Sequence, residues 1–171
     1  MTITTINRTT ITSDQEAFYH VKEHLLSQDE QCRDWENDCQ YRGYKESTVW
    51  QITEQADDWS IEDGRDISHY FNLFGGEISQ DAKCAVGALI EDIFYNTNLE
   101  GTVIEQNGKV WDVVRKSNPV WKMTEQSFFM MKQLQSIHDR NNPELWNSLL
   151  NELENQFNPY GEYTGEYKEN D

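Results

Sequence analysis

Basic residues are scarce in this chain of 171 residues. Lysine and arginine together number 14 against 31 aspartates and glutamates, which gives a formal net charge of −17 and a pI near 4.5. A protein that binds the phosphate backbone of a nucleic acid needs a basic surface, and no basic run is present. The anionic leaflet of a membrane would repel the same chain. The sequence therefore predicts neither a direct nucleic-acid partner nor a membrane partner.

Long apolar runs and closely spaced cysteines are also missing. No apolar stretch approaches the ~20 residues that a membrane-spanning helix needs, and the N-terminus lacks the basic and apolar regions of a signal peptide. The three cysteines, Cys32, Cys39 and Cys84, are odd in number and contain no C-x-x-C pair, which is not the pattern of a disulfide framework. We therefore expect a soluble, cytoplasmic protein.

Amphipathic helices are the clearest structural signal. The first is predicted over about 13–28 and begins at Ser13 in a capping box, with apolar residues at helical spacing behind it. A second is predicted over 124–139. A third follows Asn142 as the cap and Pro143 in the first turn. These three segments are the main helices that we expect.

The least polar run, KCAVGALIED over 83–92, has two interpretations. Asp81 as N-cap favours a helix over about 82–94, whereas the short apolar run 84–89 also suits a buried strand. Glycine inside a helix costs about 1 kcal/mol relative to alanine, so Gly87 needs a reason, and close approach by another backbone is the usual one. Of the two interpretations we expect the helix.

Strands are predicted on both sides of this run. The residues CQYRGY over 39–44 have the pattern of a strand that turns at Gly43. The segment 102–114 has that of a β-hairpin around Asn107-Gly108, because both central positions of such a turn favour positive φ. The sequence therefore predicts an α+β fold with about three main helices and a small antiparallel sheet.

The boundaries of the chain's parts follow from changes in composition. Residues 1–12, rich in threonine and isoleucine, suit an N-terminal arm or an edge strand. A single globular domain is expected over 13–157, with an acidic and aromatic insertion at about 44–80. Residues 158–171 lack periodicity, and we expect a flexible acidic tail there.

An ordered series of short motifs resembles a family of small phage and prophage proteins that have no assigned activity. The motifs are His24-Leu25-Leu26, Cys39-Gln40-Tyr41-Arg42-Gly43, Lys83 to Ile90, Asp92, Tyr95, Glu100-Gly101, Leu134 to Asp139 (LQSIHD), and Trp146. The chain departs from that family in having about forty residues between its two cysteine motifs, and Glu91 where relatives carry proline. The resemblance implies a phage-encoded protein.

Two sets of residues have the types that chemistry needs. A cysteine nucleophile requires a base and a carboxylate that orients the base, and Cys84, His138 and Asp139 would supply them. A zinc site would use Cys39, Cys84 and His138, but it lacks a fourth ligand and the usual spacing. Because neighbouring residues of a helix point about 100° apart, we expect Asp139 not to orient His138. Cys84 better suits a small buried hydrophobe, and His138 a helix C-terminal cap.

Other ligand-binding patterns are weak in the sequence. The segment DDWSIEDGRD lacks the ligand spacing of a calcium loop, and no phosphate-binding glycine pattern occurs. Arg42 with Tyr41 could hold a carboxylate or a phosphate, but in so acidic a chain we expect Arg42 to pair internally. The sequence therefore favours a protein that is not an enzyme and has no cofactor.

Carboxylates are dense between residues 29 and 66, with tryptophans among them. A protein that displays carboxylates at the density of duplex phosphates can occupy a basic nucleic-acid channel, and aromatic anchors add affinity that screened charges lack. The alternative is a solvated face that keeps the protein soluble. The candidate partner-binding residues are Asp34, Glu36, Asp38, Asp57, Asp58, Trp59, Glu62, Asp63 and Asp66.

Three functional hypotheses result. The first is a non-enzymatic, phage-encoded binding protein that engages a basic surface of a host protein, such as a nucleic-acid-handling or defence factor, and inhibits it. The second is a Cys/His-dependent enzyme or metal protein that uses Cys39, Cys84 and His138. The third is a structural or regulatory phage component.

Overall fold

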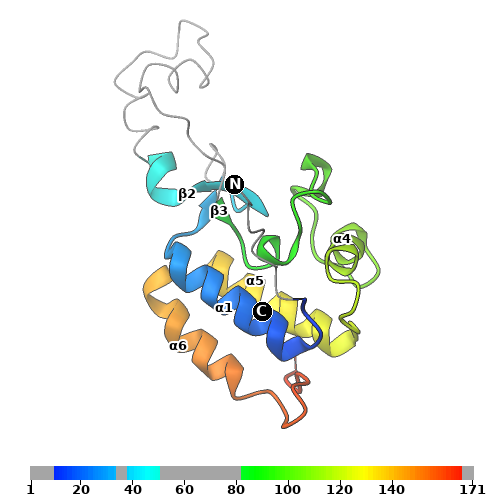
Figure 1. Cartoon of the computed structure of the whole chain (residues 1–171). Coiled ribbons are helices and arrows are strands. Elements are labelled where there is room, and N and C mark those ends of the chain that lie inside the picture. The colour runs from blue at the N-terminus through cyan, green and yellow to red at the C-terminus, as the bar shows by residue number, and fades with distance from the viewer. Residues whose placement is uncertain (1–9, 34–37, 51–81, 167–171) are drawn as a thin grey trace, which may run out of the picture.

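The computed structural model describes residues 10–33, 38–50 and 82–166 (Figure 1). The predictions for residues 1–9, for most of the acidic insertion and for the last residues of the tail lie outside the described residues. Within these ranges, no helix combines the length and the apolar character needed to cross a membrane.

Helix α1, Asp14–Gln28, begins and ends where the sequence predicts. Ser13 is its N-cap, and the Ser13 hydroxyl accepts a hydrogen bond from the Glu16 N–H at 3.2 Å. The Glu16 carboxylate bonds to the backbone and hydroxyl of Thr12, both at 2.6 Å, so the reciprocal contact falls one residue earlier than in a standard capping box. Asp29, in the left-handed region at φ 56°, ends the helix.

The other two predicted helices are also present, and they lie beside α1 below the sheet (Figure 1). Helix α5 is Glu125–Arg140 with Thr124 as its N-cap. Helix α6 is Pro143–Glu154, and the Asn142 side chain accepts from the Glu144 N–H. The apolar stripes of the three helices enclose most of the core, whose fully buried members include Phe18, Leu25, Met130, Leu134, Trp146 and Leu150.

A three-stranded antiparallel sheet covers one end of these helices. Its strands are β1 (Cys32–Arg33), β2 (Arg42–Lys45) and β3 (Ala82–Lys83), with β2 in the middle. Cys32 pairs with Lys45, and Arg42 with Lys83. The predicted turn at Gly43 is wrong, because Gly43 lies within β2. A Cβ atom there would lie 2.5 Å from the carbonyl oxygen of Arg33.

The apolar run after β3 is not the helix that we expected over 82–94. After β3 the chain makes one 3₁₀ turn, η2 (Gly87–Leu89), and residues 84–90 are all buried. The Cys84 N–H donates to the Tyr41 carbonyl at 3.2 Å, which continues the pairing with β2 and prevents a helix from starting. The reason given for Gly87 is confirmed, since a Cβ atom there would lie 1.9 Å from the Tyr41 oxygen.

The predicted hairpin around Asn107-Gly108 is also wrong. Asn107 does have positive φ, 63°, but the turn leads into helix α4, Lys109–Ser117, with Gly108 as N-cap. Val110, Trp111 and Val114 are buried at helical spacing. The described part of the chain thus has four helices of nine or more residues, α1, α4, α5 and α6, in an α+β single domain.

Residues 158–166 belong to the domain, so the prediction of a flexible tail is wrong for them. Tyr163 is 1% exposed, and its N–H donates to Asp14 Oδ2 at 3.2 Å. The other oxygen of Asp14 accepts from Trp121 Nε1 at 2.8 Å and from the Ser127 hydroxyl at 2.6 Å. One buried carboxylate therefore joins the start of α1, the start of α5 and the C-terminal segment.

Candidate functional site

A cleft of about 810 Å³ opens between α5, the loop over 100–106 and the residues that lead into β2. Its volume lies within the range of small-molecule sites, roughly 300–1,000 Å³. The lining residues are Cys39, Gln40, Tyr41, 100–106, Phe128, Lys132, Gln135, Ser136, Asp139 and Arg140. The cleft contains one cysteine and several charged side chains, and it is the candidate functional site.

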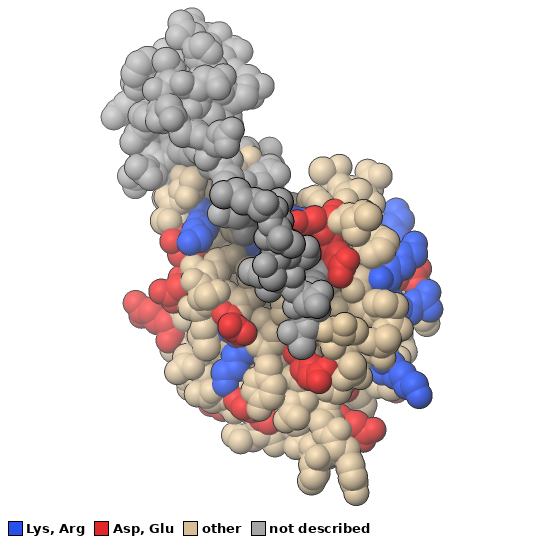
Figure 2. All heavy atoms as spheres, viewed as in Figure 1, with Lys and Arg blue, Asp and Glu red and all other residues tan. Residues whose placement is uncertain are grey.

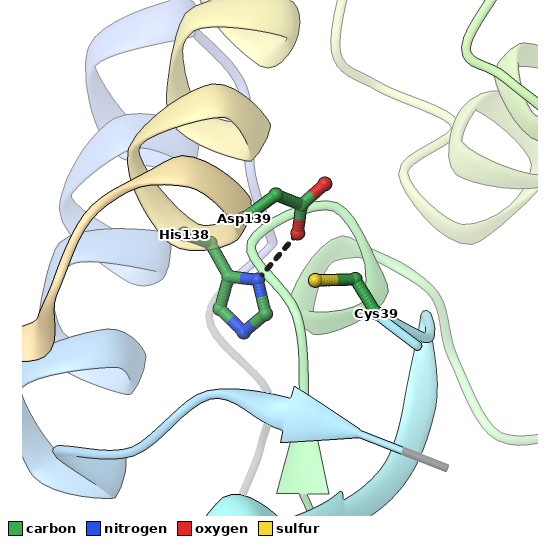
Figure 3. A group of neighbouring side chains, drawn as sticks. All are labelled: Cys39, His138 and Asp139. Carbon is green, nitrogen blue, oxygen red and sulfur yellow. Dashed lines mark hydrogen bonds and ion pairs between the residues drawn. The ribbon is translucent and has the colours of Figure 1, made fainter. Parts of the chain in front are cut away.

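The cysteine of the cleft belongs to a group with His138 and Asp139 (Figure 3). The sulfur, a carboxylate oxygen and a ring nitrogen of these residues all lie within 4.8 Å of one another. His138 and Asp139 come from the last turn of α5. Cys39 comes from the chain before β2, where a single β-bridge to Arg33 holds it. Pairing at the edge of the sheet thus places a thiol over the end of a helix.

Both ring nitrogens of His138 are already engaged. Nδ1 donates to Asp139 Oδ1 at 2.7 Å, and Nε2 accepts from the backbone N–H of Cys32 at 3.0 Å. Because an amide N–H can only donate, Nε2 must present its lone pair there and the ring proton must lie on Nδ1. The ring is fully buried and stacks on Trp146, with centroids 5.4 Å apart. His138 therefore has no lone pair left for a thiol proton or for a metal ion.

Two expectations about His138 are corrected by this geometry. Asp139 does orient the imidazole, although the two residues are adjacent in α5, because Nδ1 lies near the backbone and within reach of the next side chain. His138 is not a C-terminal cap either: Asn141 is the C-cap of α5, and the buried His138 ring bonds to Asp139 and to the Cys32 N–H. Neighbouring residues of a helix leave the backbone about 100° apart, but the Asp139 carboxylate still reaches the ring nitrogen of His138.

Cys39 is held as a protonated thiol. Burial is the main cause that raises the pKa of Cys39, to about 12; the nearby Asp139 contributes to the rise and Arg33 opposes it. The Arg33 Nη1 lies 3.0 Å from the sulfur. Burial acts to raise the pKa of Asp139 as well, but hydrogen bonds from His138, Gln135 and Cys39 outweigh it and lower that pKa. An ionised carboxylate thus lies between the thiol and the imidazole.

This order differs from that of a catalytic triad. A cysteine nucleophile needs the imidazole next to the thiol, with the carboxylate behind the imidazole. Here Asp139 is in the middle, and a carboxylate with a lowered pKa is a weak base for a thiol whose pKa is raised. The arrangement therefore suits a structural network better than proton transfer.

The structure does not bring Cys84 into this group. Cys84 is fully buried, its sulfur accepts from the Gly87 N–H at 3.2 Å, and burial raises its pKa well above the ordinary value. The predicted catalytic set with Cys84 and the predicted zinc set are thus not assembled among the described residues. Cys39 and Asp139, which those two sets did not combine, are the residues that lie together with His138.

Glu100 was not predicted, and it secures the wall of the cleft. Its carboxylate accepts from the N–H groups of Tyr41 and Arg42 at 2.9 and 3.1 Å, and from the Tyr95 hydroxyl at 2.8 Å. Arg42 pairs internally as expected: its Nη1 lies 2.7 Å from Asp92, and its guanidinium lies over the Tyr95 ring. A single glutamate in a loop gives no sequence signal of such a role.

Most of the candidate partner-binding residues lie in segments 34–37 and 51–81, outside the described residues. Asp38 is described and exposed, whereas Asp34, Glu36, Asp57, Asp58, Trp59, Glu62, Asp63 and Asp66 lie outside the described residues. Figure 2 shows acidic side chains spread over the visible face, with lysine and arginine gathered along the side where α4 lies. Helix α4 contains Lys109, Arg115 and Lys116.

Comparison of the chain with protein-family models, with curated proteins and with solved structures finds no match.

Proposed function

We propose that this protein is a non-enzymatic binding protein that engages a basic surface of a host protein. The resemblance of its motifs to small phage proteins is the reason for expecting a host partner, in the host cytoplasm. Nucleic-acid-handling and defence factors are the expected class of partner, because their functional surfaces are basic. Binding would inhibit such a partner by covering that surface.

The observation that carries this proposal is the excess of carboxylates over cations, both among the described residues and in the acidic insertion. The described residues contain 19 of the 31 aspartates and glutamates but 11 of the 14 lysines and arginines. Residues 51–81 contain eight carboxylates and a single arginine. Such a charge distribution attracts a basic partner and raises the rate of encounter, and salt screens it over about 8 Å at physiological ionic strength.

The lysine and arginine ion pairs of the described residues engage five cations but only four carboxylates. Several cations of the described residues are paired with carboxylates: Lys22 with Glu154, Arg33 with Glu46, Arg42 and Lys83 with Asp92, and Arg115 with Asp112. Exposed carboxylates such as Glu23, Glu144 and Glu152 have no cationic partner among the described residues. Much of the remaining surface charge is therefore negative, which favours the approach of a basic partner from a distance, whereas the proposed contact surface is the acidic insertion.

The alternative of a Cys/His enzyme or metal protein has less support. Its imidazole has both nitrogens engaged, and its most accessible thiol is protonated at neutral pH. A thiolate, and not a thiol, is the nucleophile and the metal ligand. Using this group would require His138 to break its hydrogen bond with the Cys32 N–H and leave that buried donor unsatisfied.

The experiment is capture of host proteins by the immobilised chain at low and high salt. In the test variant, Asp57, Asp58, Glu62 and Asp63 are all replaced by lysine. In the matched control, Glu23, Glu144, Glu152 and Glu166 are replaced by lysine, which changes the net charge by the same amount on exposed residues elsewhere. We expect the test variant to lose a partner that both the native chain and the control capture at low salt.

Equal capture by the test variant and the native chain would reject the proposed acidic interface. If neither captures a host protein at low salt, the third hypothesis, a structural or regulatory phage component, becomes the better one. Circular dichroism of each variant separates loss of binding from loss of the fold.

A further inference from the structure

Another, smaller pocket lies between α4 and η3 (Thr97–Leu99), a 3₁₀ turn that precedes α4 in the chain. Its volume is about 330 Å³, at the small end of the usual range for small-molecule sites. Four residues of α4 and three of the segment 96–99 line it, and they include two lysines and a single carboxylate. This balance of charge is the reverse of that of the chain as a whole.

The two lysines of the pocket lie on one side of α4. Lys109 and Lys116 are seven residues apart, close to two turns of an α-helix, so their side chains leave the helix in nearly the same direction, about 10 Å apart along its axis. Both are exposed, and neither forms an ion pair with another described residue. Basic side chains gather on this side of the domain in Figure 2. The pocket therefore has two ammonium groups available to a ligand.

The single carboxylate of the lining already has a cationic partner. Asp112 Oδ1 lies 3.0 Å from Nη2 of Arg115, which is not among the lining residues. Arg115 thus offsets the one negative charge of the pocket, and the charge of the two lysines remains in excess.

Amide and apolar groups complete the lining. Asn96 Oδ1 accepts from the Asn98 N–H at 3.0 Å, so the amino group of the Asn96 side chain remains as a donor. The exposed side chain of Asn98 adds a second amide. Leu99 and Val113 form the apolar part of the lining. Cations and amide donors beside a small apolar surface suit an anionic ligand.

We propose that this pocket binds a phosphate group, of inorganic phosphate or of a small phosphate monoester, between Lys109 and Lys116. A phosphate monoester carries a charge of about −1.5 to −2 at neutral pH and three strong acceptor oxygens, which match two lysines and the amide donors. Lysine binds phosphate as a compact charge on a flexible four-carbon stem, so both ammonium groups can converge on one phosphate. This site lies outside the acidic insertion and does not depend on the binding function proposed above.

Asp112 gives the proposal an internal control. Asp112→Asn removes the only carboxylate of the lining and releases Arg115, so it should strengthen phosphate binding by about twofold or more. Glu144→Gln changes the net charge of the chain by the same amount on an exposed residue of α6, outside the pocket, and should leave binding nearly unchanged. A difference between these two variants separates a local contact from a general effect of net charge.

The test is an NMR titration of the ¹⁵N-labelled full chain with three probes at constant ionic strength. The probes are inorganic phosphate, phenyl phosphate, and phenyl sulfate, which has the shape of phenyl phosphate but a single charge. We expect both phosphates to shift the amide signals of residues 96–99 and of the exposed side of α4, and phenyl sulfate to bind several-fold more weakly. The affinity of phenyl phosphate relative to that of inorganic phosphate distinguishes an organic from an inorganic ligand.

The double variant Lys109→Gln/Lys116→Gln should weaken phosphate binding by about tenfold, since each exposed charge contributes about threefold. The matched control, Lys122→Gln/Arg140→Gln, removes the same charge from exposed residues outside the pocket and should leave binding within about twofold. Because all four side chains are exposed, neither variant should unfold the domain, and unchanged amide signals elsewhere check this. Equal binding of phenyl sulfate, no shifts in this region with either phosphate, or equal affinity of the double variant and its control would overturn the proposal.

Discussion

Replacing Gly87 by alanine should be one of the most destabilising single changes in the domain. The new Cβ would lie 1.9 Å from the Tyr41 carbonyl oxygen, and real Cβ contacts essentially never fall below 3.0 Å. The two backbones must therefore separate by about 1 Å, which breaks the hydrogen bond from the Cys84 N–H to the same oxygen. Overpacking typically costs about 1–3 kcal/mol and a lost buried hydrogen bond about 1 kcal/mol, so we expect a loss of about 2–4 kcal/mol.

Urea unfolding followed by tryptophan fluorescence measures this loss as a lower midpoint at an unchanged slope. Such a loss is a large part of the roughly 5–15 kcal/mol that holds a typical domain folded. The control is Gly101→Asn, at a glycine with φ +71° and no atom within 4 Å of its Cβ position. Asparagine tolerates that conformation, so the control should cost less than about 1 kcal/mol. A Gly87→Ala variant as stable as this control would refute the reasoning.

Three further predictions concern Asp14, His138 and Cys39, which are buried or half-buried. Asp14→Ala should cost about 3 kcal/mol or more in urea unfolding, because Trp121 Nε1, the Ser127 hydroxyl and a backbone N–H lose their shared acceptor; a loss below about 1 kcal/mol would contradict this. Imidazole ¹⁵N shifts should show the proton of His138 on Nδ1 at neutral pH, and a proton on Nε2 alone would show that the assigned network is wrong. Cys39 should react slowly with a thiol reagent in the folded chain near neutral pH, and rapid labelling there would revive the enzymatic alternative. Since its folded pKa of about 12 exceeds the ordinary value of 9.0, its contribution to stability should be intact below about pH 9 and be lost as the pH rises towards 12.

The helices could be predicted where their signals are local. Ser13, Thr124 and Asn142 cap α1, α5 and α6, and each cap is followed by apolar residues at helical spacing. These features depend on residues within one or two turns, so they can be recognised without knowledge of the rest of the fold.

The errors fell on segments whose local preferences fit more than one structure. Asn107-Gly108 does form a turn, but the burial of Trp111 and Val114 on one side decides that a helix follows. The run over 84–90 is apolar on all sides, so its period is uninformative, and the backbone of Tyr41 determines its course.

The site was only partly predictable for the same reason. His138 and Asp139 were recognised as reactive types, but Cys39 reaches them through a β-bridge to Arg33, a contact with no counterpart in local sequence. The hydrogen bond that fixes the His138 ring comes from a backbone N–H, and no side-chain pattern reports it. Tertiary contacts therefore decide which reactive residues lie close enough together to form a site.

The contact of Asp14 with the Tyr163 N–H spans 149 positions of the chain. During synthesis the start of α1 leaves the ribosome long before its last hydrogen-bond donor exists, because ribosomes add only about 5–20 residues per second. Until Tyr163 has emerged, that side of the Asp14 carboxylate must remain hydrated or borrow another donor. Completion of this domain therefore waits until synthesis has passed Tyr163, 149 positions after Asp14.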